Sequence, residues 1–196
     1  MPATVSLYQE VYDQIKTATA PHGVRQTSVV RLALLVCGLL AAQTCVLSRI
    51  ADELDGLGLT DARQPSSIGR RLRRTLNDQL LRASTCYTPV VRSVVGASLL
   101  ASRLREVVLI VDESSHTDRI HLLRVSLAYR GGSLPLAWAL WPQNQPQPAG
   151  SYWEAIERVL ATVAEIIPPG LRIVVVADRA YDVPAFVDRV QARGWS

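Results

Sequence analysis

Two aspartates each follow a short run of apolar residues, and this pattern is the strongest chemical signal in the sequence. Val107–Val111 contains five apolar residues, four of them β-branched, and runs directly into Asp112. Ile173–Val176 leads in the same way toward Asp178. Runs of this composition predict strands that are buried on both faces. Because a carboxylate is costly to bury alone, we expect Asp112 and Asp178 to lie side by side as ligands of a divalent metal ion.

The region around these aspartates has the periodicity of an α/β domain. Apolar residues alternate with others between Leu123 and Tyr129, which predicts a half-buried strand, and Gly131–Gly132 predicts the following hairpin turn. The expected strands and helices cover residues 107–112, 120–130, 133–141, 151–167, 172–178 and 183–192. Their order is β-β-β-α-β-α, which opens a ribonuclease-H-like fold but is shared by other α/β folds.

The chain before residue 105 is predicted to be helical throughout. The expected helices cover residues 6–19, 25–44, 47–54, 65–81 and 88–104. Leu47–Leu54, a turn containing Gly56 and Gly58, and Pro65–Leu81 together resemble a helix-turn-helix, in which the second helix enters the major groove of DNA. Ser66 and Ser67 are the expected N-caps of that second helix.

The second helix of this pair carries a cluster of arginines. Its expected buried stripe consists of Ile68, Leu72, Leu76 and Leu80. Arg70, Arg71 and Arg74 lie away from that stripe, and Arg73 lies near its border. Nine arginines and a single acid, Asp78, occur between Arg63 and Arg105. We expect a nucleic-acid contact surface here, with a solvated arginine face as the alternative.

Charge and composition divide the chain in the same place. Residues 1–105 contain 13 Lys and Arg against 7 Asp and Glu, a formal charge of +6, whereas residues 106–196 contain 8 against 10, a charge of −2. We therefore expect a polyanion-binding helical region, 1–105, and a cation-binding α/β region, 106–196. The hydrophobic content of 48% excludes a disordered chain.

The apolar and cysteine patterns indicate a cytoplasmic protein. The most apolar run, Val29–Val46, is interrupted by polar residues, so a buried helix is expected rather than a membrane span. Three cysteines without a CxxC spacing are expected to be reduced. His116 and His121 lack the spacing of metal ligands and are expected to be surface or hydrogen-bonding residues.

Three sequence blocks and their order resemble the catalytic core of bacterial insertion-sequence DDE transposases. The blocks are VVLIVDES around Asp112, LAYRGGSLPLAWAL, and VVVADRAYD around Asp178. They are similar to a first-aspartate strand, a Y-x-G-x-x-(L/I)-P-L-x-W hairpin and an A-D-R-(G/A)-(Y/F) turn. The SSIGRRLRR stretch of the helical region also looks like the front part of that family.

This resemblance implies a function and a set of site residues. Asp112 and Asp178 would be the first two members of a catalytic carboxylate triad that binds Mg²⁺ or Mn²⁺ and is used for DNA cleavage and strand transfer. Arg70, Arg71, Arg73 and Arg74 would contact double-stranded DNA at transposon ends. Arg179 would help to neutralise phosphate charge, although an exposed turn arginine is an equal alternative. Tyr181 is expected to pack rather than to react.

The third carboxylate of that triad, a glutamate on a later helix, has no counterpart in the sequence, so we expect a C-terminally truncated transposase with an incomplete ribonuclease-H-like domain. Glu154 is a weaker substitute, and Glu113 should point to the opposite side of its strand from Asp112. A non-catalytic DNA-binding inhibitor and a decayed remnant are alternatives. The expected partners are DNA and either a second copy or a full-length transposase, in the cytoplasm at the nucleoid, without a membrane.

Overall fold

The computed structural model describes residues 3–61, 64–79, 81–102, 104–117, 119–143, 145 and 150–196. It divides into two compact units, one extending to Val90 and the other from Val91 to Ser196. The division falls before residue 105, because the helix α5 (Thr88–Ala101) has contacts in the second unit. Arg92 of α5 donates a hydrogen bond to Glu165 at 2.8 Å. The two units are described separately below.

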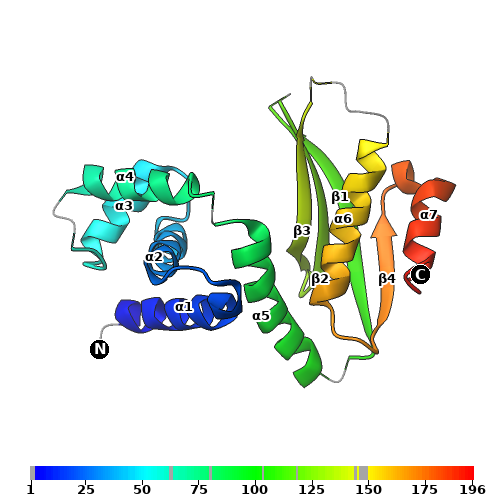
Figure 1. Ribbon diagram of the computed structural model, residues 1–196, viewed down its shortest axis with the longest axis horizontal. Helices are drawn as coiled ribbons and strands as arrows, with labels where there is room; N and C mark the ends of the chain where they lie inside the picture. Colours follow the sequence, from blue (N-terminus) through cyan, green and yellow to red (C-terminus); the bar gives the residue numbers. More distant parts are fainter. Residues whose placement is uncertain are drawn as a thin grey trace. The chain divides into compact units, whose positions relative to one another are not determined.

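The first unit is all helical, as the sequence predicts (Figure 1). Residues from three helices form its larger core cluster, and Ile50 and Leu54 in this cluster have no exposed surface. Gly38 allows two of these helices to approach closely, since a Cβ there would lie 2.6 Å from Ile50 Cγ2. The elements are α1 (Ala3–Thr19), the short η1 (Ala20–His22), α2 (Gln26–Ala42), α3 (Leu47–Gly56), α4 (Pro65–Leu76) and the π-helical turn η2 (Ala83–Tyr87).

Several details predicted for α4 are wrong. The helix ends at Leu76 rather than near residue 81, and Leu76 is 59% exposed instead of buried. Gln64 is the N-cap, so Ser66 and Ser67 lie inside the first turn, where Pro65 takes a position that needs no N–H donor. Arg63 and Leu80 lie outside the described residues, and Ile68 and Leu72 are buried as predicted.

Helix α2 and its neighbour α3 account for the apolar run in the first half of the sequence. No single helix among the described residues is long and apolar enough to cross a membrane. α2 and α3 reach that length and composition only together, and the pair is bent by 95° at the break between them.

The second unit contains a four-stranded mixed sheet in the order β3-β2-β1-β4. β1 pairs with β2 and β2 with β3 in antiparallel fashion, whereas β4 runs parallel to β1. The elements are β1 (Glu106–His116), β2 (Ile120–Tyr129), β3 (Gly132–Pro142), α6 (Ser151–Ile166), β4 (Arg172–Ala177), the 3-10 turn η3 (Arg179–Tyr181) and α7 (Pro184–Gln191). The predicted element order is confirmed, and Figure 1 shows α6 lying along one face of the sheet.

Buried and more exposed residues alternate along the strands, so one face of the sheet is covered and the other is open. On the covered face Leu109, Leu123 and Val125 are at most 1% exposed, and Ile156 and Val163 of α6 are equally buried. The tips of the hairpin differ from the prediction. Arg130 and Gly131, rather than Gly131 and Gly132, take the positive-φ turn positions, and Tyr129 is exposed.

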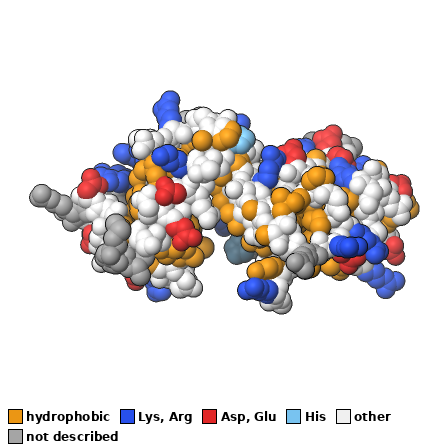
Figure 2. All heavy atoms as spheres, turned by 90° about the horizontal axis from the view of Figure 1, so that it is seen from below, with side chains coloured by type: hydrophobic (Ala, Val, Ile, Leu, Met, Phe, Trp, Pro, Cys, Tyr) orange, Lys and Arg blue, Asp and Glu red, His pale blue; other side chains and the backbone are white. Residues whose placement is uncertain are grey.

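The open sheet face and the outer edge of β4 are partly apolar. Trp138, Leu140 and Val176 are 37%, 59% and 49% exposed. In Figure 2, hydrophobic side chains form orange patches between charged ones on one face of the chain. At the edge of β4, the Ser196 N–H donates to the Ile173 carbonyl at 3.0 Å and the Val175 N–H donates to the Ser196 carbonyl at 2.6 Å. This is the hydrogen-bond pattern of a parallel strand pair.

Candidate functional site

The two aspartates occupy neighbouring positions on the two parallel strands. Val111 of β1 is paired with Ala177 of β4, so Asp112 and Asp178 follow at the next position of each strand. Both lie at or beyond the carboxyl end of the paired stretch, where open α/β sheets commonly bind ligands. The structure therefore places the backbone positions of Asp112 and Asp178 side by side on neighbouring strands.

Their carboxylates, however, make different contacts. Asp112 Oδ2 accepts a hydrogen bond from Arg124 Nη2 of β2 at 3.1 Å, within an ion pair whose side chains are 46% and 37% exposed. Asp178 Oδ1 accepts the Ala180 N–H at 2.8 Å and thereby caps η3. The exposed Arg179 is the first residue of that turn. A cation that binds both aspartates would have to displace the Arg124 guanidinium from Asp112.

A cavity of about 310 Å³ opens beside Asp178 on the α6 side of the sheet. Glu113 and His121 line it together with two tyrosines, Tyr152 of α6 and Tyr181 of η3. Asp112 is absent from the described lining residues, because alternate residues of β1 face opposite sides of the sheet. Glu113 thus points away from Asp112, as predicted.

Glu113 is the centre of a polar network that sequence reasoning missed. Its Oε2 accepts hydrogen bonds from the hydroxyls of Tyr152 at 3.1 Å and Tyr181 at 3.4 Å, and its Oε1 lies 3.3 Å from His121 Nδ1. Burial, followed by the hydrogen bond to Tyr152, raises the pKa of Tyr181 well above its usual range. Tyr181 also packs on Phe186, as expected of a core residue. The network ties β1 to β2, α6 and η3 immediately beside both aspartates.

The residues around the aspartates supply only part of a metal site. Within the described ranges, no group of three or more His, Cys, Asp or Glu side chains is placed to hold a metal ion. Asp178 lines the cavity on the α6 side, whereas Asp112 faces the opposite side of the sheet and pairs with Arg124. Mg²⁺ is often bound by one or two protein carboxylates together with water and phosphate oxygens, so each aspartate has the chemistry of a ligand, but one shared ion would require the two side chains to turn toward each other.

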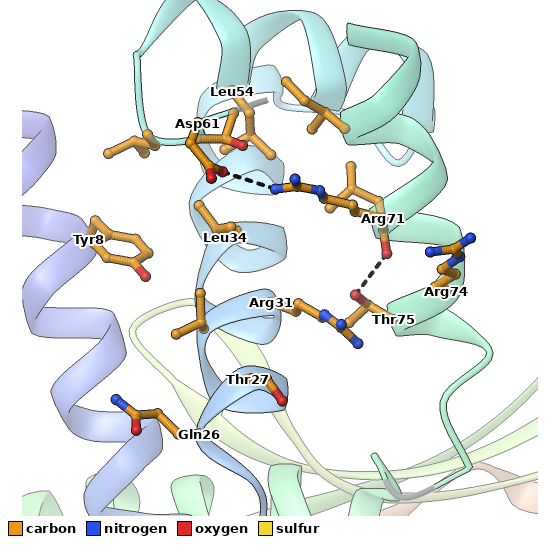
Figure 3. Close-up of a pocket in the computed structure, with 15 residues that line it drawn as sticks. Tyr8, Gln26, Thr27, Arg31, Leu34, Leu54, Asp61, Arg71, Arg74 and Thr75 are labelled. Carbon is orange, nitrogen blue, oxygen red and sulfur yellow. Dashed lines mark hydrogen bonds and ion pairs between the residues drawn. The ribbon is translucent and has the colours of Figure 1, made fainter. Parts of the chain in front are cut away.

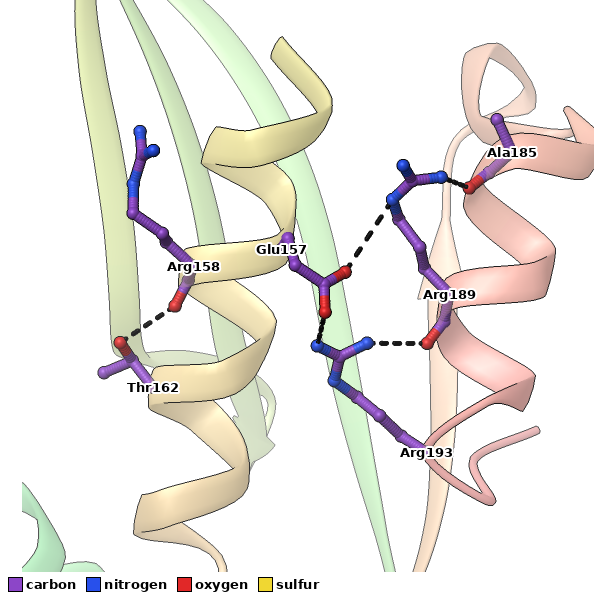
Figure 4. A network of polar contacts seen from close by, with 6 residues as sticks. All are labelled: Glu157, Arg158, Thr162, Ala185, Arg189 and Arg193. Atoms are coloured by element: carbon purple, nitrogen blue, oxygen red, sulfur yellow. Dashed lines mark hydrogen bonds and ion pairs between the residues drawn. The ribbon is translucent and has the colours of Figure 1, made fainter. Parts of the chain in front are cut away.

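The glutamates of α6 do not reach this site. Glu157 is held by Arg189 and Arg193 of the α7 segment, as Figure 4 shows. Glu165 is paired with Arg92. Glu154 is exposed and is not among the described residues that line the cavity. No α6 glutamate accordingly serves as a third carboxylate in this structure.

The four arginines of α4 lie on its solvent-facing side. Ile68 and Leu72 face the core, and at about 100° per residue the exposed residues Arg71, Arg74, Arg70 and Arg73 cover roughly 160° of the helix surface in that order. Arg71 Nη1 bonds to Asp61 Oδ1 at 3.0 Å, an exposed ion pair of small energetic value. The face is strongly basic and available to a polyanion.

The helix pair that presents this face departs from a compact helix-turn-helix. α3 and α4 are joined by residues 57–64, which is longer than the usual turn of about three or four residues. The short right-angled connection lies instead between α2 and α3. α3 carries Asp52, Glu53 and Asp55 against Arg49 alone, so α4 is the basic helix of the pair.

Comparison with known proteins adds no family to these observations. No protein-family model matches the chain, and no curated protein matches it.

Proposed function

We propose that this chain is a transposase of the DDE type that binds transposon-end DNA, with a ribonuclease-H-like second unit. One observation carries the proposal: Asp112 and Asp178 follow the register pair Val111–Ala177 on the two parallel neighbours β1 and β4. Carboxylates on neighbouring parallel strands are suited to binding a divalent cation at a phosphodiester.

The topology supports the same proposal. Three antiparallel strands, a crossover through α6 and a fourth strand parallel to the first match the element order expected of a ribonuclease-H-like domain. Ser196 makes strand-type hydrogen bonds on the far edge of β4, where a further parallel strand would lie in such a sheet.

Asp112 and Asp178 would hold the Mg²⁺ or Mn²⁺ ion. When bound, such an ion activates the attacking oxygen and stabilises the leaving oxygen of a phosphodiester. The contribution of the chain's own residues is to position the ligands. Asp178 is fixed by its cap on η3, and Arg179 beside it offers a positive charge to a phosphate. Arg124 pairs with Asp112 and would have to be displaced by any cation bound there.

The helical unit would supply DNA affinity through Arg70, Arg71, Arg73 and Arg74 of α4. The partner is double-stranded DNA at transposon ends, and a second copy or a full-length transposase completes the assembly. The corresponding location is the cytoplasm, at the nucleoid.

DNA binding by the full-length chain tests the proposal. We expect the logarithm of the association constant for a labelled duplex to fall linearly with the logarithm of salt concentration, and the slope to flatten by about 0.9 for each phosphate contact removed. The variant Arg70→Ala/Arg74→Ala should show this loss, whereas Arg49→Ala on the acidic helix α3 should behave as wild type. Absence of wild-type binding to any duplex would refute the proposal.

A non-catalytic DNA-binding protein is the second candidate. The ion pair between Asp112 and Arg124 favours it, as does the finding that no three His, Cys, Asp or Glu side chains among the described residues are placed to hold a metal ion. Its signature is DNA binding that survives Asp112→Asn without any accompanying divalent-cation binding.

A further inference from the structure

A hollow in the helical unit lies next to the arginine face of α4. It has a volume of about 780 Å³ and is lined by residues of α1, α2, α4 and the α3–α4 connection. Figure 3 shows α2 running between α1, which carries Tyr8, and α4, which carries Arg71 and Arg74. We call this hollow the α2 groove.

The lining of the α2 groove combines positive charge with hydrogen-bond donors. Arg31 reaches from α2 toward α4, close to Thr75, and Arg71 and Arg74 lie on the α4 side (Figure 3). Thr27 and Gln26, near the start of α2, add uncharged polar side chains. Arg31 is exposed although its helix is otherwise largely apolar, so its charge is free to meet a ligand in the groove.

One carboxylate, that of Asp61, is present among the described lining residues. The hydrogen bond from Arg71 lowers the pKa of Asp61, so this side chain is ionised at neutral pH. Its own side chain is 89% exposed and that of Arg71 is 51% exposed. Solvent screens such a pair strongly, so a phosphate can take the place of Asp61 on Arg71 at little cost.

The basic surface of the helical unit is therefore continuous from α4 onto α2. Arg74 belongs both to the solvent-facing side of α4 and to the wall of the groove, and Arg31 extends the positive charge onto α2. Three guanidiniums on two helices offer more positive charge than a single small anion needs, and they suit the repeated phosphates of a nucleic-acid strand. The half-buried apolar residues Val30 and Leu34 between them suit the apolar faces of deoxyriboses.

We propose that the α2 groove holds the sugar-phosphate backbone of one DNA strand, with Arg31 as a phosphate-binding residue. This inference rests on the proposed DNA binding and assigns it a second contact surface. α4 would then contact the duplex with its outer arginines, while α2 fixes the register of the strand that passes beside it.

The test compares variants of Arg31 in the full-length chain with a matched control. Arg31→Ala should flatten the salt dependence of duplex binding by about 0.9, uniformly across duplex sequences, and Arg31→Lys should restore most of it. Arg49→Ala removes the same charge from an exposed site outside the groove and should leave the slope unchanged. Asp61→Asn should act in the opposite direction and tighten binding, because it frees Arg71 for a phosphate.

The outcomes separate this inference from the proposed function. If the wild type binds DNA and Arg70→Ala/Arg74→Ala weakens binding while Arg31→Ala and Asp61→Asn have no effect, the groove assignment is wrong and the α4 surface stands. Protection of the fold by inorganic phosphate that depends on Arg31, with an unchanged DNA salt slope, would show a small-anion site instead and would also overturn it. If the wild type binds no DNA, the proposed function itself fails.

Discussion

Replacing Gly38 by alanine should destabilise the helical unit, whereas the same replacement at Gly69 should stabilise it. A Cβ at position 38 would lie 2.6 Å from Ile50 Cγ2 and 3.0 Å from Leu54 Cγ, and both of these side chains have no exposed surface. Carbon atoms in contact favour separations of about 3.5–4.0 Å, so α2 and α3 would have to move apart by about 1 Å.

The magnitude follows from two opposing terms. Overpacking a core costs about 1–3 kcal/mol, and alanine recovers about 1 kcal/mol over glycine within a helix. We expect a net loss of up to about 2 kcal/mol for Gly38→Ala. At Gly69 of α4 the nearest atom is Ala51 Cβ at 3.9 Å, an ordinary contact, so Gly69→Ala should gain up to about 1 kcal/mol.

Urea unfolding of the full-length chain, followed by far-UV circular dichroism, measures both changes. Hydrogen exchange of the α2 and α3 amides assigns them to the helical unit. A Gly38→Ala protein that unfolds at the same or a higher urea concentration than the wild type would refute the close α2–α3 packing. That result would also undermine the placement of α4, which packs on α3.

Two further predictions concern the second unit. Glu157→Gln should destabilise it by about 1 kcal/mol in thermal unfolding, because two partly buried arginines lose their carboxylate. Glu154→Gln on the same helix should change the stability little. Equal effects of the two variants would contradict the assigned pairing. Burial raises the pKa of Tyr181, so the folded state holds the phenolic proton more tightly than the unfolded state does. The contribution of Tyr181 to stability is then fully present below about pH 10 and falls as the pH rises above it. Tyr181→Phe should reduce this alkaline loss in urea unfolding between pH 9 and 11, and an unchanged pH dependence would count against the buried hydroxyl.

The sequence predicted those helices and strands in which the periodicity of apolar residues matches the residues that are buried in the fold. The runs before Asp112 and Asp178 are rich in β-branched residues, and both are strands in the sheet. The stripe at Ile68 and Leu72 is buried because the helical spacing holds until α4 ends. Leu76 departs from this pattern, because it is the last residue of α4 and is 59% exposed.

The site was only partly predictable, since its contacts join residues distant in the chain. Strand periodicity placed Glu113 opposite Asp112, but nothing local pairs Glu113 with Tyr152 and Tyr181, which are 39 and 68 residues away. In the same way, nothing in the sequence singled out Arg31 within a largely apolar helix, because the groove that it lines depends on how three helices pack.

Divalent-cation binding by the two aspartates is the most direct test of the account. Mn²⁺ binding to the full-length protein, measured by electron paramagnetic resonance, should be lost in both Asp112→Asn and Asp178→Asn and retained in Asp188→Asn, which changes an exposed acid of α7. This result would show that Asp112 and Asp178 act together as ligands. Mn²⁺ binding that persists in either variant, or no binding by the wild type, would contradict a shared metal site on β1 and β4.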